Sequence, residues 1–91
     1  MALIRAVVHI SGRVQGVWFR QSTKNMAEQN GITGWCRNNP DGSVEAVFEG
    51  EESSVKNLLN WCETGPELAR VDNLQIKWEN GTGEFSKFEI Y

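Results

Sequence analysis

Hydrophobic and polar positions alternate with two different periods along this chain. One period is typical of strands and the other of helices, so each change of period indicates where a new strand or helix begins. Residues 3–11 alternate loosely between apolar and polar side chains, which predicts a strand. Residues 43–50 place Val44, Ala46 and Phe48 on one face and polar side chains mainly on the other. This alternation predicts an antiparallel strand with one buried face.

Two other segments repeat their apolar residues at the spacing of a helix. Residues 51–64 carry apolar side chains at i, i+3, i+4 and i+7 from Val55, and residues 20–30 continue a looser stripe that starts at Phe19. Glycine follows the last periodic position of each segment, which is typical of helix ends. The predicted strands cover residues 3–11, 33–38, 43–50, 69–79 and 84–91, and the predicted helices cover residues 20–30 and 51–64.

The order of these elements predicts the fold class. It reads β-α-β-β-α-β with a short strand added at the end, which is the ferredoxin-like arrangement. We therefore expect an α+β sandwich in which two helices pack on one face of a four- to five-stranded antiparallel sheet. A chain of 91 residues is enough for one domain, residues 1–91, and a monomer is the expectation at this size.

Composition and charge exclude several classes of function. Nine basic and twelve acidic residues give a formal charge of −3, which argues against a nucleic-acid partner. No apolar stretch is long enough to span a bilayer, and the N-terminus lacks the pattern of a signal peptide. Cys36 and Cys62 form no metal-binding motif and are expected to be reduced core residues. These features together predict a cytoplasmic protein.

The segment from Gly12 to Arg20 is the strongest candidate for a binding site. Two glycines permit a tight turn that points successive N–H groups at one place, and the following helix adds a partial positive charge. Arg20 supplies a planar fork of donors that suits phosphate. The segment matches neither a Walker A loop nor GxGxxG, and an ordinary strand-to-helix connection explains the glycines equally well.

Asn38 is the second candidate residue, because its amide carries both a donor and an acceptor. It precedes a Pro-Asp-Gly turn, so a structural role in that turn is the simpler interpretation. His9 falls inside the first strand, and Asp41 and Asp72 are too far apart in sequence to suggest a carboxylate pair. A site without a general base works by orientation and electrostatics and suits an activated phosphate such as a mixed anhydride.

Both candidates fall within motifs that resemble those of the acylphosphatase family. Residues 12–20 resemble the first signature of that family, and residues 34–38 with the glycines and valine that follow resemble the second. The resemblance extends over nearly the whole chain, and Trp18 stands where a smaller residue is common. It implies hydrolysis of acyl phosphates on a ferredoxin-like fold, without metal or other cofactor. The resemblance assigns catalysis to Arg20 and Asn38, and a backbone N–H cradle for the phosphoryl group to Gln15, Gly16, Val17, Trp18 and Phe19.

The partners implied by this resemblance are small molecules. The substrate is an acyl phosphate, and inorganic phosphate is the product and an inhibitor. The motifs describe only the phosphoryl end, so acetyl phosphate, carbamoyl phosphate and larger acyl phosphates stay open as substrates. A non-catalytic module that binds an anion or metabolite on the same fold is the alternative, as is a domain of a larger carbamoyl-phosphate enzyme.

Overall fold

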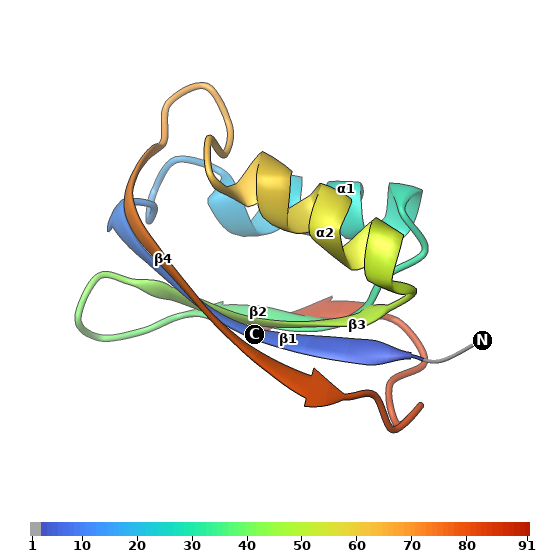
Figure 1. Cartoon of the computed structure of the whole chain (residues 1–91). Helices are drawn as coiled ribbons and strands as arrows, with labels where there is room; N and C mark the ends of the chain where they lie inside the picture. The colour runs from blue at the N-terminus through green and yellow to red at the C-terminus, as the bar shows by residue number, and fades with distance from the viewer. Residues whose placement is uncertain (1–2) are drawn as a thin grey trace.

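Two helices cover one face of a five-stranded sheet in the computed structural model, which describes residues 3–91 (Figure 1). This arrangement confirms the predicted sandwich and its β-α-β-β-α-β order. The segment that joins β1 to α1 lies at one end of the sheet (Figure 1). The elements are β1 (Ile4–Arg13), α1 (Phe19–Gln29), β2 (Thr33–Asn38), β3 (Val44–Gly50), α2 (Glu52–Cys62), β4 (Arg70–Asn80) and β5 (Phe88–Ile90).

The strands lie in the order β4-β1-β3-β2-β5, and one pair departs from the antiparallel pattern that the sequence predicts. β5 runs parallel to β2, and Trp35 lies opposite Glu89 in that pair. The direction follows from the connection, because the chain leaves β4 at the end of the sheet where β2 begins. It then crosses to the opposite edge and runs in the same direction as β2.

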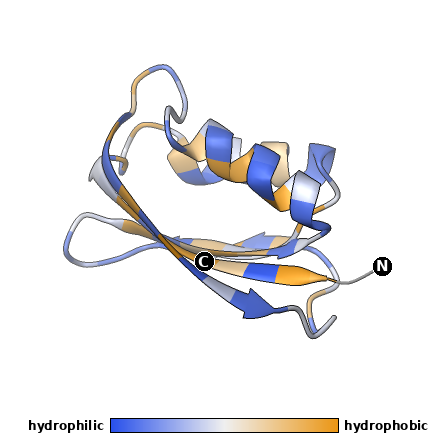
Figure 2. Ribbon diagram, in the orientation of Figure 1, coloured by the Kyte–Doolittle hydropathy of each residue, from blue (hydrophilic) through white to orange (hydrophobic). Residues whose placement is uncertain are grey.

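The core lies between the helices and the sheet. Ala6, Val8 and Ile10 of β1 are fully buried there, and their alternation is the one that the sequence predicts. α2 contributes the stripe that begins at Val55, and Cys36 of β2 packs into the same cluster. Figure 2 shows hydrophobic and hydrophilic stretches alternating along both helices. Within residues 3–91, neither helix has the length and apolar character that a membrane crossing requires.

β1 is longer than predicted and continues through Gly12 to Arg13. A β-bulge between Ser11 and Gly12 shifts the register against β4. Gly12 has φ +125°, and a Cβ atom there would collide with the backbone of Arg70 and Asp72. The first glycine of the motif therefore lets two strands approach closely at the point where the loop begins.

The final strand covers only Phe88–Ile90 and is shorter than predicted, and the turn that precedes it binds a buried carboxylate. Glu49 of β3 is only 1 % exposed. It accepts hydrogen bonds from the backbone N–H groups of Thr82 (3.1 Å) and Gly83 (3.0 Å) and from Arg5 Nε (3.0 Å). This cluster anchors the crossing that leads to β5.

Replacing Glu49 with alanine should lower the free energy of unfolding by about 3 kcal/mol, because Arg5 and two N–H groups lose their buried partner. Chemical denaturation measures the change. Glu52→Ala is the matched control, since Glu52 forms only an exposed ion pair with Lys56 and its loss should leave the unfolding midpoint almost unchanged. Equal losses in the two variants would contradict this role of Glu49.

Candidate functional site

A cavity of about 420 Å³ opens where the loop after β1, the first turn of α1 and the end of β2 meet. The two candidate motifs are separated in the sequence and contribute to the same cavity. A site shared by Arg20 and Asn38 requires that the two motifs lie close together, as they do here. The lining residues are Val14, Gly16, Trp18, Phe19, Arg20, Gln21, Asn38 and Ile90.

The loop presents a run of unoccupied hydrogen-bond donors. Within the described residues 3–91, the N–H groups from Gln15 to Gln21 donate no backbone hydrogen bond. Gly16 makes the turn with φ +73°, and Trp18 follows at the N-cap of α1 with φ +66°. The helix begins immediately afterwards, so its N-terminal partial positive charge lies beside these donors. This combination favours an anion at the loop.

Arg20 adds the only full charge among the residues that line the cavity. It lies in the first turn of α1, and its NH1 donates a hydrogen bond of 2.9 Å to the backbone oxygen of Tyr91. The Tyr91 N–H in turn donates to the carbonyl of Cys36 in β2 (2.9 Å). The end of the chain beyond β5 therefore holds the guanidinium in place and leaves its other donors for an anion.

Asn38 is the last residue of β2, and its side chain reaches the cavity. Its Oδ1 is buried and has no hydrogen-bond partner within the described part of the chain. A buried amide oxygen without a partner costs stability, and a rotation of the amide that turns this oxygen toward the cavity would let an occupant donate a hydrogen bond to it. Water is the simplest such donor.

The five cradle residues differ in whether they line the cavity. Gly16, Trp18 and Phe19 line the cavity, whereas Gln15 and Val17 do not. Val17 is 3 % exposed, and its side chain packs in the core and so anchors the backbone of the loop. The proposed cradle therefore uses Gln15 and Val17 only through their backbone N–H groups.

Gln15 has a side-chain role that the sequence did not indicate. Its Nε2 donates hydrogen bonds to the carbonyl oxygens of Asn39 (2.8 Å) and Ser43 (2.9 Å). These carbonyls belong to the turn between β2 and β3, immediately after Asn38. Gln15 therefore ties the loop that carries the N–H groups to the strand end that carries the amide.

Gln15→Leu should lower the free energy of unfolding by about 1–2 kcal/mol, because two carbonyls lose their donor. It should also reduce turnover, since the loop and Asn38 lose their connection. Denaturant titration and steady-state kinetics measure the two effects. Gln21→Leu is the control for stability, because the Gln21 amide makes only an exposed bond to Asn25 within α1. Full stability of Gln15→Leu would contradict the role of this connection.

The two cysteines are free thiols and both are buried, as the sequence predicts. Burial raises the pKa of Cys36 to about 12 and outweighs the charge of Arg20, which lowers it. Burial also raises the pKa of Cys62. Neither thiol is therefore a nucleophile near neutral pH.

The raised pKa of Cys36 predicts both low reactivity and a dependence of stability on pH. Stability should not depend on this thiol below pH 9.0, its ordinary pKa, and should fall between there and about pH 12, because only the unfolded thiol ionises in that range. A Cys62→Ala variant isolates Cys36. Its remaining thiol should resist a disulfide reagent at pH 8 in the native state and react after denaturation. Fast native reaction would contradict the burial of Cys36.

His9 lies outside the cavity and faces a different neighbour. Its Nε2 is 3.9 Å from Oδ2 of Asp41, and both side chains are substantially exposed. Among residues 3–91, no group of three or more histidine, cysteine or acidic side chains gathers as a metal site would require. The expectation that His9 is an ordinary strand residue agrees with this position.

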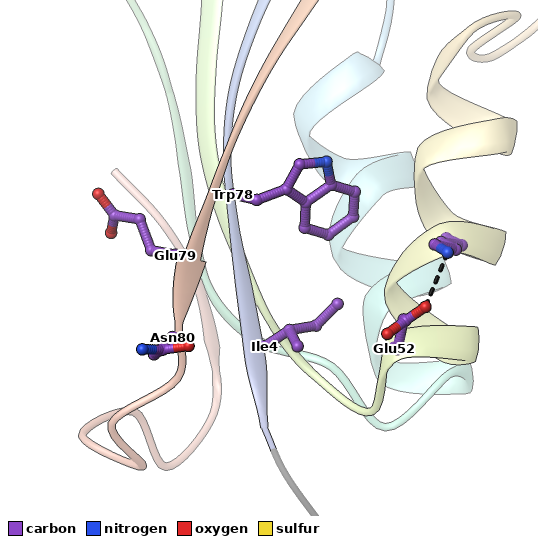
Figure 3. A pocket seen from close by; sticks show the side chains of 6 residues that line it. Ile4, Glu52, Trp78, Glu79 and Asn80 are labelled. Atoms are coloured by element: carbon purple, nitrogen blue, oxygen red, sulfur yellow. Dashed lines mark hydrogen bonds and ion pairs between the residues drawn. The ribbon is translucent and has the colours of Figure 1, made fainter.

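A second cleft of about 490 Å³ lies between β4 and α2. Figure 3 shows the indole of Trp78 projecting from β4 toward α2, with Ile4 beside it. Glu52 and Lys56 line the opposite wall and pair with each other at 2.7 Å. No residue that the sequence singles out for chemistry lies here, although this cleft is the larger of the two.

Comparison with known proteins identifies the family. The acylphosphatase family model matches residues 6–90. The chain belongs to the acylphosphatase family. An acylphosphatase from Roseiflexus is 53 % identical over 90 residues, which cover 99 % of this chain and 97 % of that protein.

Solved acylphosphatase structures share the fold. An acylphosphatase from Coxiella burnetii has 37 % identity and a TM-score of 0.88 over 99 % of this chain and 94 % of that chain. An acylphosphatase from Bacillus subtilis has 26 % identity and a TM-score of 0.93, with 97 % and 98 % coverage. The resemblance of the two motifs to acylphosphatase signatures is therefore confirmed at the level of the family.

Proposed function

We propose that the cavity between the β1–α1 loop and the end of β2 hydrolyses the carboxyl–phosphate bond of acyl phosphates, with Arg20 and Asn38 as its catalytic residues. The observation that carries this proposal is the lining of one cavity by Arg20, Asn38 and a loop whose N–H groups have no backbone partner. Family membership supplies the reaction class, hydrolysis of an acid anhydride.

Arg20 and the loop N–H groups hold the phosphoryl group. The guanidinium keeps free donors beyond its bond to Tyr91. The N–H groups from Gln15 to Phe19 donate no backbone hydrogen bond within the described chain, and Gly16, Trp18 and Phe19 line the same cavity as Arg20. Charge that develops on the phosphoryl oxygens during reaction then meets fixed donors that need little reorganisation. The substrate is a small molecule, and inorganic phosphate binds the same donors as product and inhibitor.

Asn38 orients the water. Its Oδ1, turned toward the cavity and without any partner within residues 3–91, accepts a hydrogen bond from the water, whose oxygen attacks phosphorus as the bond from phosphorus to the acyl oxygen breaks. The acyl group leaves as a carboxylate, and the proton of the water passes to a phosphoryl oxygen. The residues that line the cavity include no histidine, carboxylate or thiol to act as a general base.

The lack of a general acid also restricts the substrate to activated phosphates. A carboxylate leaves without protonation, whereas the alkoxide of a phosphate monoester needs a proton donor that this lining does not offer. The lining also lacks the carboxylate and imidazole ligands that a divalent cation prefers. We therefore propose a reaction that needs no metal or cofactor.

Parallel assays of benzoyl phosphate and glycerol 2-phosphate, a monoester whose leaving group is an alkoxide, each with and without a chelator, test this function. We expect hydrolysis of benzoyl phosphate only, at a rate that the chelator leaves unchanged. Loss of activity with the chelator, or equal turnover of the monoester, would contradict the proposal. Binding of phosphate without turnover of any acyl phosphate would favour the alternative, a non-catalytic anion-binding module.

The proposed cellular setting follows from the thiols and the size of the chain. Two buried cysteines that remain unpaired suit a reducing compartment, so we place the protein in the cytoplasm. We propose that it acts as a monomer and needs no nucleic-acid or membrane partner. Sedimentation at micromolar concentration tests the monomer, and a mass near 10.3 kDa is the expected result.

A further inference from the structure

Trp18 occupies an unusual backbone conformation for a bulky residue. Among residues 3–91 it is the only non-glycine residue with positive φ, at φ 66° and ψ 19°. A large side chain in this left-handed region costs stability, and such residues are concentrated at functional sites. Gly16, two positions earlier, also has a positive φ, so two of three consecutive residues in this loop have a positive φ.

The indole has no structural role that would offset this cost. Trp18 is 75 % exposed, more than any other large hydrophobic residue in the described chain. It makes no side-chain hydrogen bond to cap α1, and in residues 3–91 its ring takes part in none of the aromatic pairs. The stability of the fold therefore gives no reason for tryptophan at this position.

The location of Trp18 points to a role at the site. It lines the same cavity as Arg20 and Asn38 and lies two residues before Arg20. When Arg20 and the loop N–H groups hold the phosphoryl group, the acyl group extends away from them toward the exposed part of the wall. An exposed indole at that wall offers a flat apolar surface to the acyl group.

Charge in the cavity limits the acyl group further. Arg20 is the only charged residue in the lining, and the proposed reaction uses it for the phosphoryl group. An acyl group that carries a second phosphate or carboxylate would find no other cation in the lining. The other apolar residues in the lining are Val14 and Phe19, each 1 % exposed, and the half-buried Ile90, so Trp18 offers by far the most exposed apolar surface.

We propose that Trp18 determines acyl specificity by favouring acyl phosphates whose acyl group is aromatic or otherwise apolar over those with small or anionic acyl groups. This inference rests on the proposed function and extends it to the acyl end of the substrate. The side chain of Trp18 stacks on the acyl group, while its backbone N–H belongs to the phosphoryl cradle. The strained conformation keeps the ring at the wall of the cavity.

The test compares kcat/KM for benzoyl phosphate and acetyl phosphate in the wild type, Trp18→Asn and Trp18→Phe. Asparagine tolerates the left-handed conformation, so Trp18→Asn should fold. We expect the ratio of benzoyl to acetyl phosphate to fall about tenfold in Trp18→Asn, a loss comparable to one aromatic pair. Trp18→Phe keeps a ring and should retain most of the preference.

Two results would overturn this role. One is a ratio in Trp18→Asn equal to that of the wild type, and the other is an equal fall in both variants, which would show that the aromatic surface is not responsible. Failure of the proposed function has a different signature, because the wild type would then hydrolyse neither acyl phosphate. The inhibition constant of inorganic phosphate, measured in all three proteins, reports separately on the phosphoryl cradle.

Discussion

Arg20→Ala should lower kcat/KM for benzoyl phosphate by about 10³-fold or more, because it removes the only charge that faces the phosphoryl group in the cavity. The loss should appear in binding as well as in turnover, so inhibition by inorganic phosphate should weaken strongly. Steady-state kinetics with phosphate as a competitive inhibitor measures both effects. Circular dichroism and a denaturation curve establish that the variant is folded.

Arg20→Lys is the matched control for charge. Lysine keeps the positive charge but lacks the planar fork that donates at once to Tyr91 and to an anion. We expect partial retention of phosphate inhibition and a turnover between that of the wild type and Arg20→Ala. Normal turnover and normal phosphate inhibition in Arg20→Ala would contradict the assignment of this cavity as the phosphoryl site.

The second large effect is expected for Asn38→Ala, which should lower kcat about 10²-fold while phosphate inhibition changes little. The reason is the division of roles in the cavity, where Arg20 and the loop bind the phosphoryl group and Asn38 orients the water. Removing the buried Oδ1 takes away the acceptor for the water. Kinetics at saturating benzoyl phosphate, together with the phosphate inhibition constant, separate the two roles.

Asn39→Ala provides the comparison for Asn38. The two residues are adjacent and chemically identical, but the Asn39 side chain bonds to Ser43 within the turn and does not line the cavity. The backbone carbonyl that receives Gln15 also remains in Asn39→Ala. We expect kcat within about threefold of the wild type for this variant. Parallel losses of turnover and phosphate binding in Asn38→Ala would indicate a structural role for Asn38.

The fold could be predicted from periodicity because most elements bury one regular face. The stripe from Val55 and the alternation of Val44, Ala46 and Phe48 each specify an element and its orientation toward the core. The parallel direction of β5 had no such signal, because its pairing depends on a distant edge strand. The burial of Glu49 was equally hidden, since its partners Arg5, Thr82 and Gly83 all lie more than thirty positions away in the sequence.

The site was predictable in its main parts because its residues stand in two recognisable motifs. Arg20 and Asn38 could be named from sequence, and the structure brings both to one cavity. The hydrogen bonds from Gln15 to the β2–β3 turn could not be predicted, because a glutamine exposed in a loop and a glutamine that joins two segments look alike in a sequence. The positive φ of Trp18 was also unpredictable, since only glycine commonly signals it.

The central claim is that an oriented water attacks phosphorus at the cavity formed by Arg20 and Asn38. Hydrolysis of benzoyl phosphate in water enriched in oxygen-18 tests it most directly, with mass spectrometry of both products. The account predicts that the label appears in inorganic phosphate and that benzoate stays unlabelled. Label in benzoate would show attack at the carbonyl carbon and would contradict the roles proposed for Arg20 and Asn38.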